Sequence, residues 1–168
     1  MPSSPSSLLS ALVPDVAERL RDALAQARRE GGDDAWRAVV RALRAGEEPV
    51  QALIEHVPVV IYVAAFDEHA TLRYVSPRIE QLTGVTAREL VGSADSWYGC
   101  IHPDDVQRVR RTEAASFRDG TELDCAYRIV HRDGTEFHVW DRDVVVRDDE
   151  GTPLFTQGVV LDITPLRK

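Results

Sequence analysis

Residues 121–146 read TELDCAYRIVHRDGTEFHVWDRDVVV. Two runs rich in β-branched and aromatic residues lie on either side of RDG (132–134), and Asp-Gly is a strong signal for a tight hairpin turn. A third such run, PLFTQGVVLDI (153–163), follows the somewhat longer turn RDDEG (147–151). Strands joined by short connections run antiparallel, because a parallel pair needs a long crossover. This stretch therefore predicts three consecutive antiparallel strands.

Two more strands are expected upstream. VVIYVAAF (59–66) and TLRYVS (71–76) are short apolar runs separated by DEHA, which predicts a second hairpin. Residues 78–91 and 104–120 lie between the hairpins and have helical spacing. Strands do not alternate with long helices, so the pattern predicts an α+β fold with an antiparallel sheet.

The region before the strands has a different character. Residues 1–7 are expected to be a disordered leader, residues 8–56 a helical region, and residues 57–168 the main domain. Apolar positions in the helical region recur every three or four residues, so each helix has an apolar face. These faces can pack on the chain's own sheet or against a second copy, and we expect a homodimer. The candidate dimer contacts in this region are Val13, Val16, Leu20, Trp36, Val40, Leu43 and Leu53.

Composition narrows the class of protein. The formal charge is −8 over 168 residues, and neither part of the chain has the basic excess that phosphate binding requires, so we expect no nucleic-acid partner. No apolar run is long enough to cross a bilayer, and the N-terminus lacks the basic start of a secretory signal. Two cysteines without a CxxC pair fit a reducing cytoplasm.

The stretch GCIHPDD (99–105) contains residue types that bind metals or transfer protons. A helix that begins at Pro103 would use His102 as its cap and would favour acidic residues in its first turn. The histidines do not form an HxxxH or HxH pair, so the sequence predicts no metal site. We therefore interpret the cluster as a helix start. The weaker alternative is a small hydrolase that uses His102 with Cys100 or Asp105.

The order of elements and several short sequence motifs resemble the PAS family, in particular the bacterial subgroup with a C-terminal PAC segment. The resemblance covers roughly residues 57–164, and the closing words GVVLDIT (158–164) are part of it. The other matching stretches are VPVVIYVAAFD (57–67), RYVSPRIEQLTGVTARELVG (73–92), WYGCIHPDDVQRV (97–109) and YRIVHRDGTEFHVWDRDVVVRDDEG (127–151).

This resemblance implies a five-stranded antiparallel sheet with short helices over one face and a pocket between them. It also implies dimerisation through helices that precede the domain. Comparison with the family and strand alternation predict that Trp140 faces the N-terminal helices or a partner. The predicted pocket residues are Trp97, Tyr98, Tyr127, Ile129, Val139, Asp141 and Gly158.

The resemblance leaves the cofactor unknown. Flavin-binding relatives use a GxNCRFLQ motif, and the corresponding stretch here, GSADSWYGCIHPDD (92–105), lacks it. Haem-binding relatives use an axial histidine, and a capping role for His102 would aim its ring away from the pocket. Both observations argue against these cofactors. Whether the pocket is filled by side chains or holds a ligand stays open, although Asp141 favours a polar ligand because a buried carboxylate needs a partner.

The sequence therefore predicts a non-catalytic sensory or interaction PAS module of a cytoplasmic bacterial signal-transduction protein. A ligand-free dimerisation module is the alternative. We expect an output domain or partner of the diguanylate cyclase, histidine kinase or phosphatase type, which is not visible before Lys168. We expect no association with a membrane.

Overall fold

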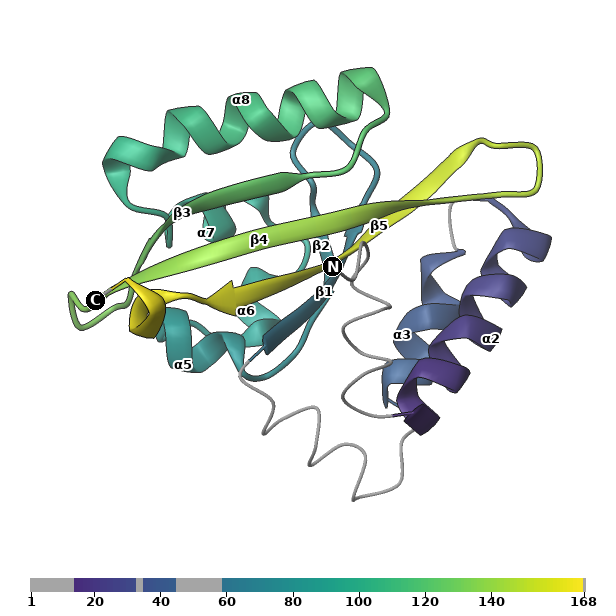
Figure 1. Cartoon of the computed structure of the whole chain (residues 1–168), viewed down its shortest axis with the longest axis horizontal. Coiled ribbons are helices and arrows are strands. Elements are labelled where there is room, and N and C mark those ends of the chain that lie inside the picture. Colours follow the sequence, from purple (N-terminus) through teal and green to yellow (C-terminus); the bar gives the residue numbers. More distant parts are fainter. Residues whose placement is uncertain (1–13, 33–34, 45–58, 168) are drawn as a thin grey trace.

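One antiparallel sheet forms the centre of the computed structural model, which describes residues 14–32, 35–44 and 59–167 (Figure 1). Its strand order is β2-β1-β5-β4-β3, and every neighbouring pair is antiparallel. The strands are β1 (Val59–Ala65), β2 (Leu72–Val75), β3 (Asp124–Val130), β4 (Glu136–Arg147) and β5 (Pro153–Asp162). The predicted α+β fold with a five-stranded antiparallel sheet is confirmed.

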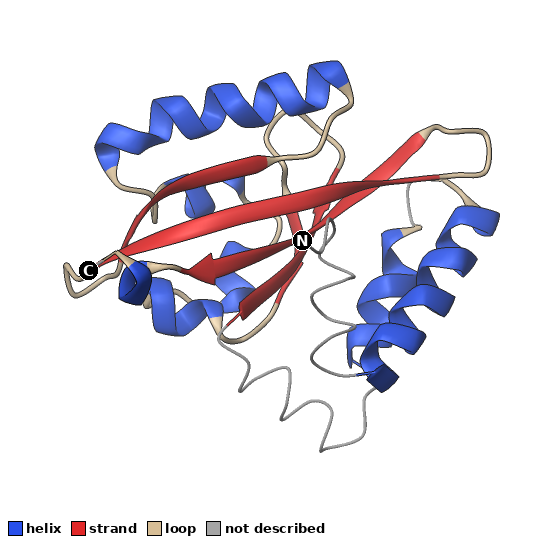
Figure 2. Cartoon of the chain, viewed as in Figure 1, coloured by secondary structure: helices blue, strands red, loops and turns tan. Residues whose placement is uncertain are grey.

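Helices cover both faces of this sheet (Figure 2). One face carries α5 (Ile79–Thr83), α6 (Ala87–Leu90), α7 (Ala94–Tyr98) and α8 (Pro103–Asp119). The other face carries α2 (Pro14–Glu30) and α3 (Trp36–Arg44), while the short helix η1 (Thr164–Leu166) follows β5. In the described part of the chain, no helix is long and apolar enough to cross a membrane.

The neighbouring strands β1 and β5 are buried on both faces along most of their length. In β1 the five residues from Val60 to Ala64 are all buried, as are the six residues from Phe155 to Val160 in β5. A strand covered on both sides gains free energy from apolar residues at every position, so β1 loses the usual alternation, whereas β5 also buries Thr156, Gln157 and Gly158. β3, by contrast, alternates exposed and buried residues from Asp124 to Tyr127, as a strand with one covered face does.

The first core lies between the sheet and α5–α8. It includes Ile79 and Leu90 from the short helices, Val109 from α8, and Ile129 and Val139 from the sheet, each fully buried. Burial of such side chains contributes roughly 2 kcal/mol each, which is enough to hold the short helices on the sheet.

The second core joins α2 and α3 to the other face of the sheet. Ala27 and Val39 are fully buried there against Val63 and Phe155. Packing of the apolar stripes on the chain's own sheet therefore accounts for this part of both helices. Among the predicted dimer contacts, Val40 is 6% exposed inside this core.

The remaining predicted dimer contacts have varied placements. Trp36 is partly buried at the edge of the second core. Trp140 is partly buried on β4, and its indole N–H donates a 2.7 Å hydrogen bond to Asp124. Val13 and Leu53 lie outside the described residues. For Val16, Leu20 and Leu43 only the backbone is described, within α2 and α3.

Helix α8 is held at both ends. His102 caps its start by accepting a 3.2 Å hydrogen bond from the backbone N–H of Asp104, and Pro103 occupies the first turn. The Asp105 carboxylate accepts bonds from the Arg128 backbone N–H at 2.9 Å and from its guanidinium at 3.0 Å, which ties the helix to β3. At the other end, Arg147 donates a 2.6 Å hydrogen bond to the carbonyl oxygen of Gly120.

The β3–β4 turn follows the Asp-Gly signal. Gly134 has φ +91°, a left-handed conformation that glycine adopts without strain. The backbone N–H of Thr135 donates a 2.8 Å hydrogen bond to the Asp133 carboxylate, and the N–H of His131 bonds the carbonyl of Thr135 at 2.8 Å. The predicted tight turn is confirmed.

Candidate functional site

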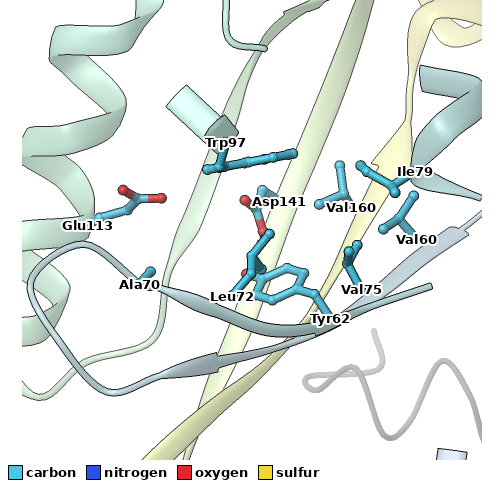
Figure 3. A pocket seen from close by; sticks show the side chains of 10 residues that line it. All are labelled: Val60, Tyr62, Ala70, Leu72, Val75, Ile79, Trp97, Glu113, Asp141 and Val160. Atoms are coloured by element: carbon cyan, nitrogen blue, oxygen red, sulfur yellow. The ribbon is translucent and has the colours of Figure 1, made fainter. Parts of the chain in front are cut away.

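A cavity lies in the first core, between the sheet and the helices (Figure 3). The space between its atoms is about 340 Å³ including its mouth, but the centre of a water-sized sphere fits into only about 20 Å³ of it. That space holds about one water molecule. Its lining is Val60, Tyr62, Ala70, Leu72, Val75, Ile79, Trp97, Glu113, Asp141 and Val160.

Asp141 is the polar centre of this cavity. It is 3% exposed on β4, and its carboxylate accepts hydrogen bonds from the hydroxyls of Tyr62 at 2.8 Å and Tyr127 at 2.7 Å. Burial raises the pKa of Asp141 to about 7, although the two tyrosine hydrogen bonds act in the opposite direction. Burial beside this carboxyl raises the pKa of both tyrosines, so both hydroxyls stay protonated donors.

Glu113 is a second buried carboxyl, brought to the cavity by α8. It is 6% exposed, and the Tyr98 hydroxyl donates to it while lying 3.3 Å from the carbonyl oxygen of His69. One hydroxyl proton cannot serve both acceptors, so a proton on Glu113 lets both bonds form. Burial raises the pKa of Glu113 to about 8, with Asp141 acting in the same direction. The raised pKa values of Asp141 and Glu113 therefore favour protonated carboxyls in this cavity near neutral pH.

The close approach of two strands explains the glycine of β5. Gly158 pairs with Tyr62 across β1 and β5, and a Cβ atom at this position would overlap the Tyr62 ring. The glycine thus leaves room for the ring to lie across β5, where its hydroxyl reaches Asp141. Gly158 contributes by admitting the tyrosine.

The other predicted pocket residues lie in or beside the cavity. Trp97 lines it, and its ring contacts that of Tyr127 edge-on with centroids 6.4 Å apart. Tyr98 is buried against Glu113 on α8. Ile129 and Val139 are fully buried in the surrounding core and do not line this cavity.

Sequence reasoning did not single out two residues of the site, Tyr62 and Glu113. Tyr62 is the one residue with a polar atom in the side chain within the apolar run VVIYVAA. Glu113 lies four residues after Val109 and four before Phe117, so it interrupts the apolar stripe of α8. An acid at an apolar position of an amphipathic helix is the signal that could have identified Glu113.

The GCIHPDD stretch is confirmed as a helix start. His102 and Asp105 hold α8 in place, as described above, and burial raises the pKa of the Cys100 thiol, which makes it a poor nucleophile. Cys100 Sγ lies 3.4 Å from the carbonyl oxygen of Ser96. Among the described residues, no three His, Cys, Asp or Glu side chains are grouped so as to hold a metal ion.

A five-stranded antiparallel sheet that encloses a small, mostly apolar cavity beneath short helices defines the class of PAS-type domains. The sequence profile of the PAS fold family matches residues 72–160. The chain belongs to this family.

Curated relatives include sensors. An uncharacterized protein, y4lL, of Sinorhizobium fredii is 32% identical over 132 residues, which cover 79% of this chain and 15% of that protein. The two-component sensor PprA of Pseudomonas aeruginosa is 28% identical over 125 residues, which cover 72% of this chain and 13% of that protein. The chain thus spans a small part of the relatives' length.

A solved structure supports the same family. The N-terminal domain of a diguanylate cyclase with PAS/PAC sensor from Marinobacter aquaeolei is similar with a TM-score of 0.59 and 26% sequence identity. The match covers 66% of this chain and 99% of that domain. The chain is therefore similar in sequence and in fold to the sensor domain of a signalling protein.

Proposed function

We propose that this chain is a non-catalytic sensory module that binds a small ligand between its sheet and helices. The observation that carries the proposal is the pair of tyrosine hydroxyls, Tyr62 and Tyr127, that converge on the buried carboxylate of Asp141 inside a cavity. Burying a carboxylate costs free energy that an apolar residue of similar size would not cost. A recognition role explains why this cost is retained.

The module is proposed to belong to a bacterial signal-transduction protein. Support comes from the two-component sensor and the diguanylate cyclase among its relatives. A histidine kinase, diguanylate cyclase or phosphatase is the proposed output. The two cysteines, Cys100 and Cys125, are buried and unpaired, which supports a reducing cytoplasmic location.

Transmission of the signal is proposed to use β5. This strand lies between β1 and β4, carries Gly158 on its cavity face, and leads directly into η1. Its end is fixed to β4, because the backbone N–H of Ile163 bonds the carbonyl of His138 at 2.8 Å. A ligand that favours one position of the Tyr62 side chain would thereby shift the position of β5 and of η1, which follows it.

Dimerisation through the N-terminal helices is part of the proposal. The partly buried Trp36 of α3 lies with the guanidinium of Arg37 5.6 Å from its ring centroid. Aromatic and arginine side chains are enriched in protein interfaces. The outer face of β4, with its partly buried Trp140, is a second proposed contact.

A ligand-free dimerisation module is the second candidate, and the cavity volume favours it. Space for about one water molecule means that a larger ligand must displace side chains before it binds. The two candidates differ in whether the purified protein retains or takes up a small molecule.

Native mass spectrometry of the full chain, compared with its denatured mass and its absorption spectrum, tests the proposal. A dimer with additional bound mass supports a ligand sensor and identifies the ligand by its mass. A dimer at the bare mass that also takes up no compound from a metabolite panel favours the assembly module. A bare monomer in both experiments contradicts the dimer proposal.

A further inference from the structure

Two adjoining cavities lie under α8, and they share Ala70 and Glu113. The second has about 300 Å³ of space between its atoms, including its mouth, and is lined by Asp143 and Thr156 among others. Each cavity has room for about one water molecule, so an organic ligand enters only when lining side chains move. Glu113 stands where the two meet, so movement of this one side chain would change both.

The two cavities are acidic without a compensating base. Asp141, Glu113 and Asp143 are 3%, 6% and 5% exposed, and all three line one or both cavities. Within the described residues, neither lining contains Lys, Arg or His. The guanidinium of Arg110 lies outside both linings, 4.0 Å from the centroid of the Tyr98 ring. The electrostatic potential of this interior therefore favours positive charge.

The side-chain hydroxyl of Thr156 independently indicates a missing hydrogen-bond partner in the second cavity. It is 7% exposed on β5 and lines the second cavity with Glu113 and Asp143, yet its hydroxyl has no hydrogen-bond partner in the described structure. A buried hydroxyl without a partner costs about 1–3 kcal/mol. A ligand N–H group in this cavity would satisfy it.

Burial raises the pKa of all three carboxyls, so this cluster is only partly ionised near neutral pH until a cation arrives. Burial raises the pKa of Asp143 to about 6, and the neighbouring acids raise that of Glu113 further. In the part of the chain that the structure describes, the cation that acts on these carboxyls is Arg110, which lowers the pKa of Glu113 and whose side chain is 44% exposed. The titratable groups that act on them or line the cavities beside them are Tyr62, Asp67, Tyr98, Arg110, Glu122, Tyr127 and the three carboxyls themselves.

We propose that the ligand is a small organic amine, bound as its ammonium ion by Asp141, Glu113 and Asp143 with its apolar part against Trp97. This inference rests on the proposed ligand-sensing function and names the ligand class. Binding transfers a proton from a carboxyl to the solvent and leaves a carboxylate–ammonium pair in its place. The apolar lining and the ring of Trp97 suit an alkyl or aromatic body.

Three probes of matched length test the charge preference on the full chain by isothermal titration calorimetry. They are n-butylamine, butanoate and n-butanol, which differ only in the head group. The amine stays protonated below about pH 9, so any change in its affinity reports on the protein. We expect n-butylamine to bind. For each proton that binding releases, the affinity should rise about tenfold per pH unit between about pH 6 and 7.

Two substitutions and a control locate the site. Glu113→Gln keeps the side-chain volume and removes the charge, and we expect the affinity for n-butylamine to fall about tenfold or more. Thr156→Val removes the hydroxyl without a partner, so the protein should become more stable while its affinity falls. A purely structural threonine would change stability alone. Asp104→Asn, in an exposed acid of the same helix, should leave affinity unchanged.

The outcomes separate this inference from the proposed function. Preferential binding of butanoate or n-butanol would overturn the amine class and keep the ligand pocket. Equal binding of n-butylamine by Glu113→Gln and the parent protein would overturn the site. If no probe binds and a broader panel of amines also fails, the amine inference is refuted, whereas the ligand-sensing function is refuted only if the metabolite panel described above also shows no binding.

Discussion

The unfolding free energy of this domain should fall as the pH rises from about 5 to 7, because the folded chain keeps protons that the unfolded chain releases. Among the buried carboxyls, Glu113 has the largest rise in pKa. Its pKa rises from 4.5 to about 8 on burial. Where the folded state holds one more proton than the unfolded state, stability decreases by about 1.4 kcal/mol for each pH unit.

Glu113→Gln isolates this contribution. Glutamine fills the same volume and keeps a carbonyl oxygen for the Tyr98 hydroxyl, but it does not titrate. We therefore expect the slope of stability against pH to become less negative by about 1 kcal/mol per pH unit between about pH 5 and 7. Asp141→Asn should have an effect in the same direction, because burial raises that carboxyl's pKa to about 7.

Urea unfolding followed by tryptophan fluorescence measures these slopes, since Trp97 is buried beside the cavity. Asp104→Asn is the matched control, because that side chain is 78% exposed and lies on the same helix. If Glu113→Gln has the slope of the parent protein, Glu113 is ionised in the folded state and the reasoning above is refuted.

Three further changes test other parts of the structure, each by urea unfolding. Gly158→Val should destabilise the fold by about 1–3 kcal/mol because its Cβ would overlap the Tyr62 ring, and unchanged stability would contradict this packing. Asp105→Asn should cost about 2 kcal/mol at pH 7. Because the Arg128 guanidinium and backbone N–H lower the Asp105 pKa to about 2, the difference should shrink as the pH falls from about 4 toward 2, and a constant difference would argue against the ion pair. Gly134→Ala should cost about 1 kcal/mol because φ is +91°, whereas a neutral effect would mean that the turn relaxes.

Local chemistry explains what the sequence could predict. The Asp-Gly turn, the Pro103 helix start and the β-branched runs act over a few residues, so their effect can be read without knowing the rest of the fold. α7 was not predicted because Ala94–Tyr98 is a single short turn without an apolar repeat. Its cap, Ser93, accepts a 3.2 Å hydrogen bond from the backbone N–H of Ser96 and is the signal that was overlooked.

The site was harder to predict because its residues meet across the sheet. Asp141 was singled out as a buried acid, but its partner Tyr62 lies 79 residues away, on β1. The strand order that brings them together places β5 between β1 and β4, and no local signal encodes that order. Glu113 depends on how α8 is rotated over the cavity. The packing of α2 and α3 on the sheet is likewise a long-range choice between two apolar surfaces.

The attachment of α8 at both ends has a consequence for its motion. Helices usually open from their termini, where the last turns fray. Here the Asp105–Arg128 contacts hold the first turn and the Arg147–Gly120 hydrogen bond holds the last. Opening of the helix must then break one of these attachments first. Amide hydrogen exchange should accordingly protect the helix as one cooperative unit, without the usual gradient from its ends to its middle.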